Sequence, residues 1–128
     1  MLEIDNGQTL MDELWDATSA KVELSDFMKR SFFAARGAAP VFHDNSRSYH
    51  RYFMRGKGVL KREKAMLGVY TKDVSRQGIA FLSPVPLLPK ESVKLRVPAA
   101  ELSLEITRCR RIEAACYDCG GRFTLKRD

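Results

Sequence analysis

The last two thirds of the chain alternate between short apolar runs and polar turns, a pattern typical of β-strands. Strict alternation is clearest at Ser92–Val97, and the prolines at 84, 86 and 89 predict an extended turn that no central strand would tolerate. The expected strands are Gly58–Arg62, Met66–Lys72, Ile79–Ser83, Ser92–Val97, Leu102–Ile106 with an extension to Ile112 left open, and Cys116–Leu125 with a bulge or bend at Gly120-Gly121. Six short strands with frequent turns predict a mainly β fold, a small antiparallel barrel.

Residues 9–36 have a helical period and predict one or two helices ahead of the barrel. The first opens with a capping-box-like sequence at Thr9, and a second start lies at Ser25-Asp26, with Gly37 as the expected C-cap. The face expected to be apolar carries Leu10, Leu14 and Ala17, with Met11, Trp15 and Thr18 beside it.

This organisation divides the chain into a helical leader at 1–37, a linker at 38–46 and a barrel domain at 47–128. The aromatic and methionine content of the leader is too high for a solvated spacer, since residues of these types are normally buried. We expect its apolar face to pack on the barrel, with contact to a second copy of the chain or to another protein as the alternative.

Charge is distributed unevenly between the two parts. Residues 1–46 hold four Lys/Arg against eight Asp/Glu, a net of −4, and residues 47–128 hold eighteen against eight, a net of +10, together the +6 of the whole chain. A basic domain behind an acidic leader indicates an anionic partner for the domain, or simple solubility and attraction between the two parts. No apolar run reaches the roughly 20 residues of a membrane helix, and no secretion signal is visible, so we expect a cytoplasmic protein.

The sequence Asp73-Val-Ser75-Arg-Gln-Gly78 joins two of the expected strands. Asp and Ser side chains can satisfy the amides of a turn, and glycine can adopt a backbone conformation denied to other residues. Upstream, Arg47, Arg51 and Arg55 follow one another at four-residue spacing. A carboxylate, a hydroxyl and a glycine facing several guanidinium groups would suit a ligand that carries both phosphate and purine.

The order Arg-x-x-x-Arg followed by Asp-x-Ser-x-x-Gly, on a barrel-like pattern, resembles the PilZ domain family of bacterial cyclic di-GMP receptors. The resemblance covers about residues 47–125 and implies a six-stranded PilZ-like barrel that binds this nucleotide in signalling. Members of the family have about eight residues between the second arginine and the middle of the first strand. Arg51 fits that distance to Val59, so Arg47 and Arg51 are the matched pair and Arg55 is an accessory charge.

The resemblance implies a role for each motif residue. Arg47 and Arg51 would lie on a loop that closes over the ligand, where guanidinium groups bind phosphate or the O6/N7 edge of guanine. Asp73 would accept hydrogen bonds from the N1/N2 edge of guanine, Ser75 would bond a base or phosphate oxygen, and Gly78 would permit close approach. Ordinary turn chemistry at Asp73 and Ser75 is the alternative reading.

Other chemistry has weaker support. Cys116-x-x-Cys119 has the spacing of metal ligands, but zinc needs four, and we expect Cys109, Cys116 and Cys119 to serve as small hydrophobic residues. The residues form no hydrolase or transferase constellation, so neither catalysis nor a cofactor is expected. Two rival functions remain: a basic barrel that binds nucleic acid, with Tyr49, Tyr52 and Phe53 stacking on bases, and a PilZ-like protein-interaction module without ligand.

Overall fold

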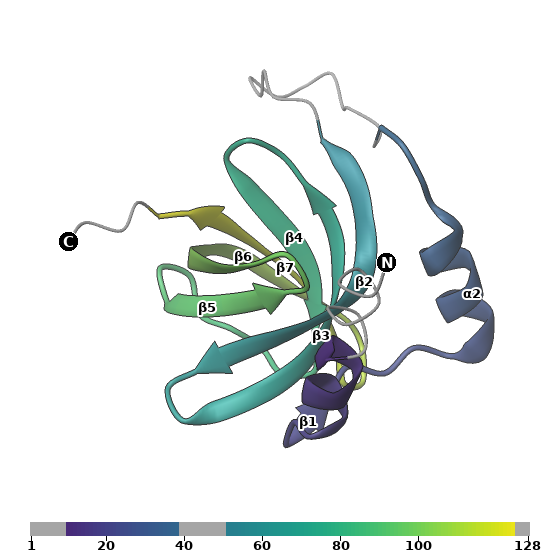
Figure 1. Cartoon of the computed structure of the whole chain (residues 1–128), viewed down its shortest axis with the longest axis horizontal. Helices are drawn as coiled ribbons and strands as arrows, with labels where there is room; N and C mark the ends of the chain where they lie inside the picture. Colours follow the sequence, from purple (N-terminus) through teal and green to yellow (C-terminus); the bar gives the residue numbers. More distant parts are fainter. Residues whose placement is uncertain (1–9, 39–50, 125–128) are drawn as a thin grey trace.

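The structure, a computed structural model, describes residues 10–38 and 51–124. A first helix covers residues 10–16, and the other elements are β1 (Ala20–Lys21), α2 (Asp26–Ala34), β2 (Tyr52–Arg62), β3 (Ala65–Val74), β4 (Gly78–Ser83), β5 (Ser92–Val97), β6 (Ala100–Glu113) and β7 (Cys116–Phe123). The two helices precede the barrel, as the sequence predicts (Figure 1).

Six antiparallel strands close into a barrel within the described residues. The sheet has the order β1-β3-β2-β5-β6-β7-β4, and pairing of β3 with β4 closes the ring. The short β1, which the sequence pattern did not predict, pairs in parallel with β3 outside the ring through Ala20 and Leu67. The predicted antiparallel barrel is therefore confirmed, and it has one additional outer strand.

Alternation of side chains in and out of the barrel creates its core. The interior is filled by branched and aromatic residues from every strand of the ring, and its fully buried members include Leu60, Val69, Phe81, Leu95 and Ile106. These are the positions at which the predicted strands carry apolar residues, so burial of one face fixes the register of each strand. Strand β5 shows this most simply, since its residues alternate exposed and buried along its length.

Strand β2 is longer than the sequence indicates, and one expected irregularity lies in a different strand. Strand β2 begins at Tyr52 rather than at Gly58. The irregularity expected at Gly120-Gly121 lies instead in the partner strand β6, where Thr107 is the extra residue between the pairs Ile106–Gly121 and Arg108–Gly120. The two glycines pair regularly in β7 because the neighbouring strand, not their own, absorbs the change in register.

The first helix packs on the outside of β2 and β3 and creates a second, smaller core. Met11 and Trp15 are buried there, and the Trp15 indole stacks on Tyr70 at 5.3 Å between ring centroids and donates to the Val69 carbonyl at 2.9 Å. Leu10, expected on the apolar face, is 48% exposed. The buried face is therefore shifted by one residue from the expected one, because the indole needs this carbonyl as its partner.

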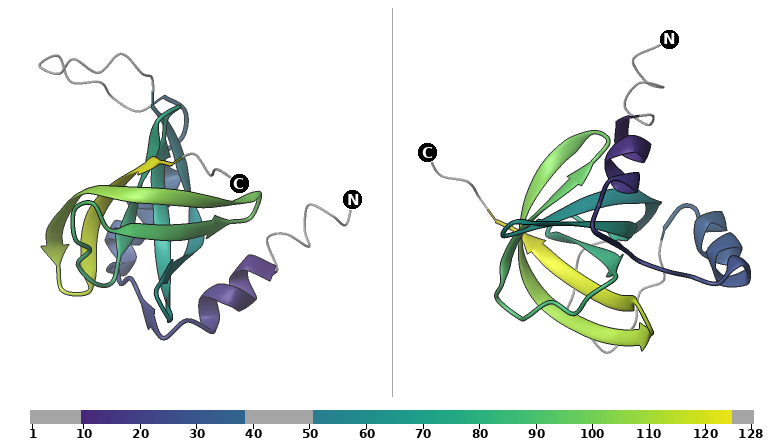
Figure 2. Two further views of the ribbon diagram at one scale, coloured as in Figure 1. Left: turned by 90° about the vertical axis from the view of Figure 1, so that its left-hand side faces the viewer. Right: turned by 90° about the horizontal axis from the view of Figure 1, so that it is seen from below.

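Helix α2 lies against the barrel beside β2 with little of its surface buried (Figures 1 and 2). It begins as predicted at Ser25, whose hydroxyl accepts from the Met28 amide, and it ends at Ala34 with Ala35 as C-cap rather than Gly37. Phe33 meets the Tyr70 ring edge-on at 4.9 Å, so both helices contact the same tyrosine. None of the helices in the described residues has the length and apolar character needed to cross a membrane.

Candidate functional site

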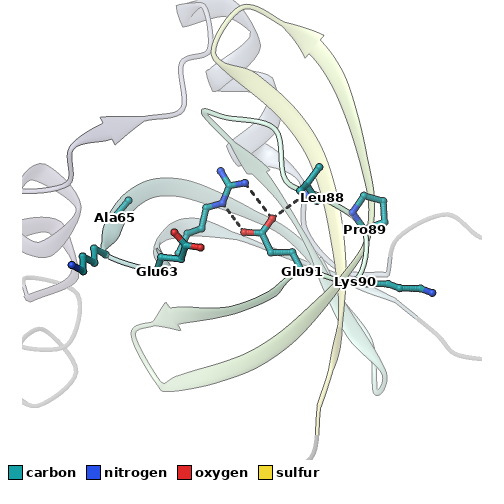
Figure 3. A pocket seen from close by; sticks show the side chains of 8 residues that line it. Glu63, Ala65, Leu88, Pro89, Lys90 and Glu91 are labelled. Atoms are coloured by element: carbon teal, nitrogen blue, oxygen red, sulfur yellow. Dashed lines mark hydrogen bonds and ion pairs between the residues drawn. The ribbon is translucent and has the colours of Figure 1, made fainter.

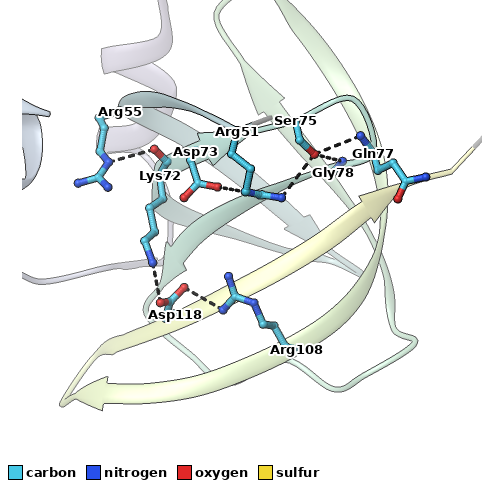
Figure 4. Close-up of polar contacts among 9 residues, drawn as sticks. All are labelled: Arg51, Arg55, Lys72, Asp73, Ser75, Gln77, Gly78, Arg108 and Asp118. Atoms are coloured by element: carbon cyan, nitrogen blue, oxygen red, sulfur yellow. Dashed lines mark hydrogen bonds and ion pairs between the residues drawn. The ribbon is translucent and has the colours of Figure 1, made fainter. Parts of the chain in front are cut away.

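Arg51 and Asp73 come together at one end of the β2–β3 hairpin. Antiparallel pairing places Phe53 opposite Asp73, so Arg51, two residues earlier, lies at the rim beside the carboxylate. The Arg51 Nε atom donates to Asp73 Oδ1 at 2.5 Å (Figure 4). Asp73 is only 8% exposed, so its charge is held next to a guanidinium in a partly desolvated place.

A β-bulge in β3 determines which way Asp73 points. The register passes from Thr71 opposite Phe81 to Asp73 opposite Ala80, so Lys72 is the extra residue. Phe81 belongs to the barrel core, and Asp73 and Lys72 therefore both lie on the outer face. Two consecutive charged residues on one face could not be read from the alternation of the sequence.

Ser75 organises the turn between β3 and β4 and also reaches the arginine. Its hydroxyl oxygen accepts from the amides of Gln77 at 3.2 Å and Gly78 at 3.3 Å, and Arg51 Nη1 approaches it at 3.4 Å. The Ser75 amide donates to the Gly78 carbonyl at 2.9 Å. Turn chemistry and proximity to the candidate site thus coexist at this residue.

Glycine is required at position 78 because β4 and β7 approach closely there, and not because the backbone adopts an unusual angle. A Cβ atom built on it would lie 2.2 Å from the Gly121 carbonyl oxygen, a separation that real Cβ atoms essentially never show. Among the described glycines only Gly37 has a positive φ, so the expectation of a special conformation at Gly78 is wrong. Strands β4 and β7 instead approach so closely here that a side chain has no room.

Arg55 lies in β2 and connects the barrel to helix α2. Its Nε donates to the Lys72 carbonyl and its Nη1 to the Phe32 carbonyl of α2, both at 3.0 Å. The guanidinium carbon lies 4.0 Å from the centroid of the Phe32 ring and 4.5 Å from that of Phe53. Burial lowers the pKa of Arg55, while Asp73 and Asp118 act in the opposite direction; the side chain stays cationic.

Of the six residues expected to bind ligand, the structure brings Arg51, Asp73, Ser75 and Gly78 to one rim. Arg55 is adjacent through the Lys72 carbonyl, but its guanidinium is turned toward α2. Arg47 lies outside the described residues. The geometry therefore brings Arg51 together with the Asp-x-Ser-x-x-Gly half of the motif.

A charged cluster that the sequence did not indicate lies on the same outer face. Asp118 of β7 is 4% exposed and accepts from Lys72 Nζ at 2.7 Å and from Arg108 Nη1 at 3.2 Å (Figure 4). Burial opposes ionisation of this carboxyl, but the hydrogen bonds and charges of Lys72 and Arg108 prevail and hold its pKa below the usual range. No local motif joins these residues, which are 46 and 10 positions apart from Asp118.

The three cysteines lie on the neighbouring strands β6 and β7. Cys109 and Cys119 are directly opposite on β6 and β7 with their sulfur atoms 3.4 Å apart. Burial raises the pKa of Cys116 and raises that of Cys119 well above the ordinary thiol range, which makes both poorer nucleophiles than an exposed thiol. In the described part of the chain no group of three His, Cys, Asp or Glu residues is placed to hold a metal ion.

A pocket lies at the far end of the β2–β3 hairpin (Figure 3). It is formed by the turn after Arg62 and by the loop that ends at Glu91, and these two residues pair at 2.6 Å. The hairpin pairs Arg62 with Ala65 at this end and Phe53 with Asp73 at the other. The pocket is therefore separate from the candidate site.

Comparison with protein-family models identifies the PilZ domain in this chain. The family model of the PilZ domain matches residues 45–126, which include the barrel and all six candidate residues. Among curated proteins, none matches the chain.

Proposed function

This chain belongs to the PilZ domain family, and from that premise we propose that it is a cytoplasmic receptor for cyclic di-GMP in a bacterial signalling pathway. The family is in general one of cyclic di-GMP-binding modules. The observation that carries the proposal for this chain is the contact of Arg51 with both Asp73 and Ser75, which are 22 and 24 residues away. Arg51 of the arginine motif thus lies beside the Asp-x-Ser-x-x-Gly turn.

The chemistry of the rim suits the ligand. Cyclic di-GMP presents two phosphates and two guanine bases, and a guanidinium can pair with a phosphate, pair with the O6/N7 edge of guanine or stack on the base. Asp73 is an acceptor matched to the N1-H and N2-H donors of guanine. In the proposed complex Arg47 and Arg51 close over the ligand, and the short Ser75 side chain bonds a base or phosphate oxygen.

Arg55 connects the ligand site to helix α2, and ligand binding would be transmitted to the helix through it. Its guanidinium joins the Lys72 carbonyl, next to Asp73, to the Phe32 carbonyl near the end of α2. A ligand that draws the Arg55 guanidinium toward Asp73 would break its hydrogen bond to the Phe32 carbonyl. This would loosen α2, in which no residue is fully buried. Such coupling requires that α2 have two positions of different affinity for ligand-bound barrel.

The rival functions have less support. A nucleic-acid-binding barrel would offer Phe53 to a base, yet this ring lies against Arg55 at 4.5 Å. A ligand-free interaction module would not need Asp73, Ser75 and Gly78 together with Arg51. We therefore propose a non-catalytic receptor that needs no cofactor, in which the nucleotide is the ligand.

Calorimetric titration of the full chain with cyclic di-GMP tests the proposal, with cyclic di-AMP and linear pGpG as comparison ligands. We expect saturable binding of cyclic di-GMP and far weaker binding of the other two. Cyclic di-AMP lacks the donor edge that Asp73 would read, and pGpG keeps that edge but has an open backbone whose ordering on binding costs entropy. Asp73→Asn should weaken cyclic di-GMP binding, because the amide presents one acceptor and one donor group. Absence of cyclic di-GMP binding would refute the receptor, and equal affinity for cyclic di-AMP would refute guanine reading by Asp73.

A further inference from the structure

Three cationic side chains converge on the single carboxylate of Asp118. Lys72 Nζ lies 2.7 Å from it, Arg108 Nη1 3.2 Å and Arg110 Nη2 3.9 Å. The carboxylate side chain is 6% exposed, whereas the side chains of Arg108 and Arg110 are 51% and 76% exposed. One covered negative charge therefore stands among three positive charges, and the excess positive charge faces solvent.

The cluster shares the outer face of the barrel with the Arg51–Asp73 pair. The bulge in β3 turns both Lys72 and Asp73 outward, so the two sites meet at consecutive residues. Lys72 reaches across β4 to Asp118 on β7, because β4 pairs with β3 on one side and with β7 on the other. Figure 4 shows the two sets of polar contacts together on these strands.

Small residues lie between the two sets of charges. Ala80 of β4 pairs with Gly120 of β7, and Gly78 pairs with Arg122. A Cβ on Gly120 would lie 3.0 Å from Arg108 Nε and 3.3 Å from its Cζ, so the Arg108 side chain occupies the space above this glycine, its partner across the two strands. An arginine held in place by a carboxylate and half exposed is preorganised and keeps donors available to a ligand.

We propose that Lys72 and Arg108, positioned by Asp118, form a second anion site that takes a phosphate of the cyclic dinucleotide bound at Arg51 and Asp73. The inference rests on the proposed function, because it assigns the ligand of that same rim. A cyclic dinucleotide has two phosphates, and the arginine motif alone need engage only one. Ligand lying across β4 would reach both sets of cations, and each would contribute a charge-assisted hydrogen bond.

The test compares variants in which one cationic residue is replaced by glutamine, and it measures their affinity for cyclic di-GMP by calorimetry. Arg108→Gln and Lys72→Gln remove the proposed phosphate contacts. Arg96→Gln is the matched control, because Arg96 is an exposed arginine on β5, a strand that contacts neither β4 nor β7. We expect Arg108→Gln and Lys72→Gln each to weaken binding about tenfold, and Arg96→Gln to bind as the unchanged chain does.

Thermal unfolding of each variant separates a binding role from a structural one. If Arg108→Gln and Lys72→Gln lower the unfolding temperature but retain the affinity of Arg96→Gln, the cluster only stabilises the barrel and the inference is refuted while the receptor stands. If the unchanged chain itself binds no cyclic di-GMP, both the receptor and the second anion site are refuted. A tenfold loss in both variants with unchanged affinity in Arg96→Gln supports the second anion site.

Discussion

The Nε atom of Arg51 donates to Asp73 Oδ1 at 2.5 Å. The guanidinium that should bind nucleotide and the carboxylate that should read guanine thus pair with each other. Ligand must either replace this contact or fit around it. The pair also holds the Asp73 carboxylate in one orientation in a place largely removed from water, so the acceptor is already positioned for guanine.

The arginines should therefore differ in their effect on cyclic di-GMP affinity. Arg51→Ala removes a group that touches both Asp73 and Ser75, and we expect a loss of about ten- to a hundredfold or beyond measurement. We expect Arg47→Ala to lose nearly as much. Arg55→Ala should weaken binding less, because that guanidinium faces α2. Calorimetry on the three variants measures these affinities. If Arg47→Ala leaves the affinity unchanged and Arg55→Ala lowers it most, the arginine pair is Arg51 and Arg55 instead.

Gly78→Ala should destabilise the barrel itself. The added Cβ would meet the Gly121 carbonyl oxygen at 2.2 Å, and since both atoms belong to paired backbone, β4 and β7 must separate. We expect a loss of about 1–3 kcal/mol in the free energy of unfolding, measured by urea denaturation. Gly56→Ala is the control, because no atom lies within 4 Å of a Cβ at that glycine, and it should change stability by no more than about 0.5 kcal/mol. Equal effects would contradict the close approach.

Most of the barrel could be predicted because its strands bury one face. At Ser92–Val97 the alternation alone gave both bounds, and at Glu63-Lys64 the polar pair marked the turn between β2 and β3. The motif around Ser75 was equally visible, since its polar residues interrupt two apolar runs. Local pattern suffices where the physical cause is local.

Features that depend on bulges or on distant partners could not be predicted. The buried face of the first helix differs by one residue from the predicted one, because the Trp15 indole donates a hydrogen bond to the Val69 carbonyl, 54 positions away. The cluster at Asp118 joins Lys72 and Arg108 from two other strands, and Asp73 lies beside it on the outer face only because of a bulge, of which periodicity gives no sign. The need for glycine at position 78 comes from Gly121 on another strand, which no turn rule contains.

Asp118 should make stability depend on pH in a defined sense. Its pKa is lowered in the folded chain, so its contribution is present above the unfolded value of about 3.9 and is lost as pH falls through the folded pKa. Asp118→Asn should cost about 1–3 kcal/mol at pH 7, toward the lower end because its partners are partly exposed. The gap between the two proteins should shrink below about pH 4, where the carboxyl becomes neutral like the amide.

Urea denaturation of both proteins across this pH range measures the effect. Glu101→Gln serves as the control, because Glu101 is an exposed carboxylate on the neighbouring strand β6. A gap between Asp118→Asn and the unchanged chain that stays constant from pH 7 to pH 3 would show that ionisation of Asp118 does not stabilise the barrel.

Trp15 should report ligand through Tyr70. This indole is the single tryptophan of the chain, it stacks on Tyr70, and Phe33 of α2 contacts the same tyrosine. If cyclic di-GMP loosens the Arg55 contact with the Phe32 carbonyl, Phe33 moves from Tyr70 and the fluorescence of Trp15 changes in proportion to saturation.

Arg55→Lys is the matched variant, because lysine keeps the charge but lacks the planar group that lies against the rings of Phe32 and Phe53. We expect Arg55→Lys to bind ligand with a much smaller change in fluorescence. A full change in that variant would mean that Arg55 does not carry the coupling, and no change in the unchanged chain at saturation would mean that α2 keeps its place when ligand binds.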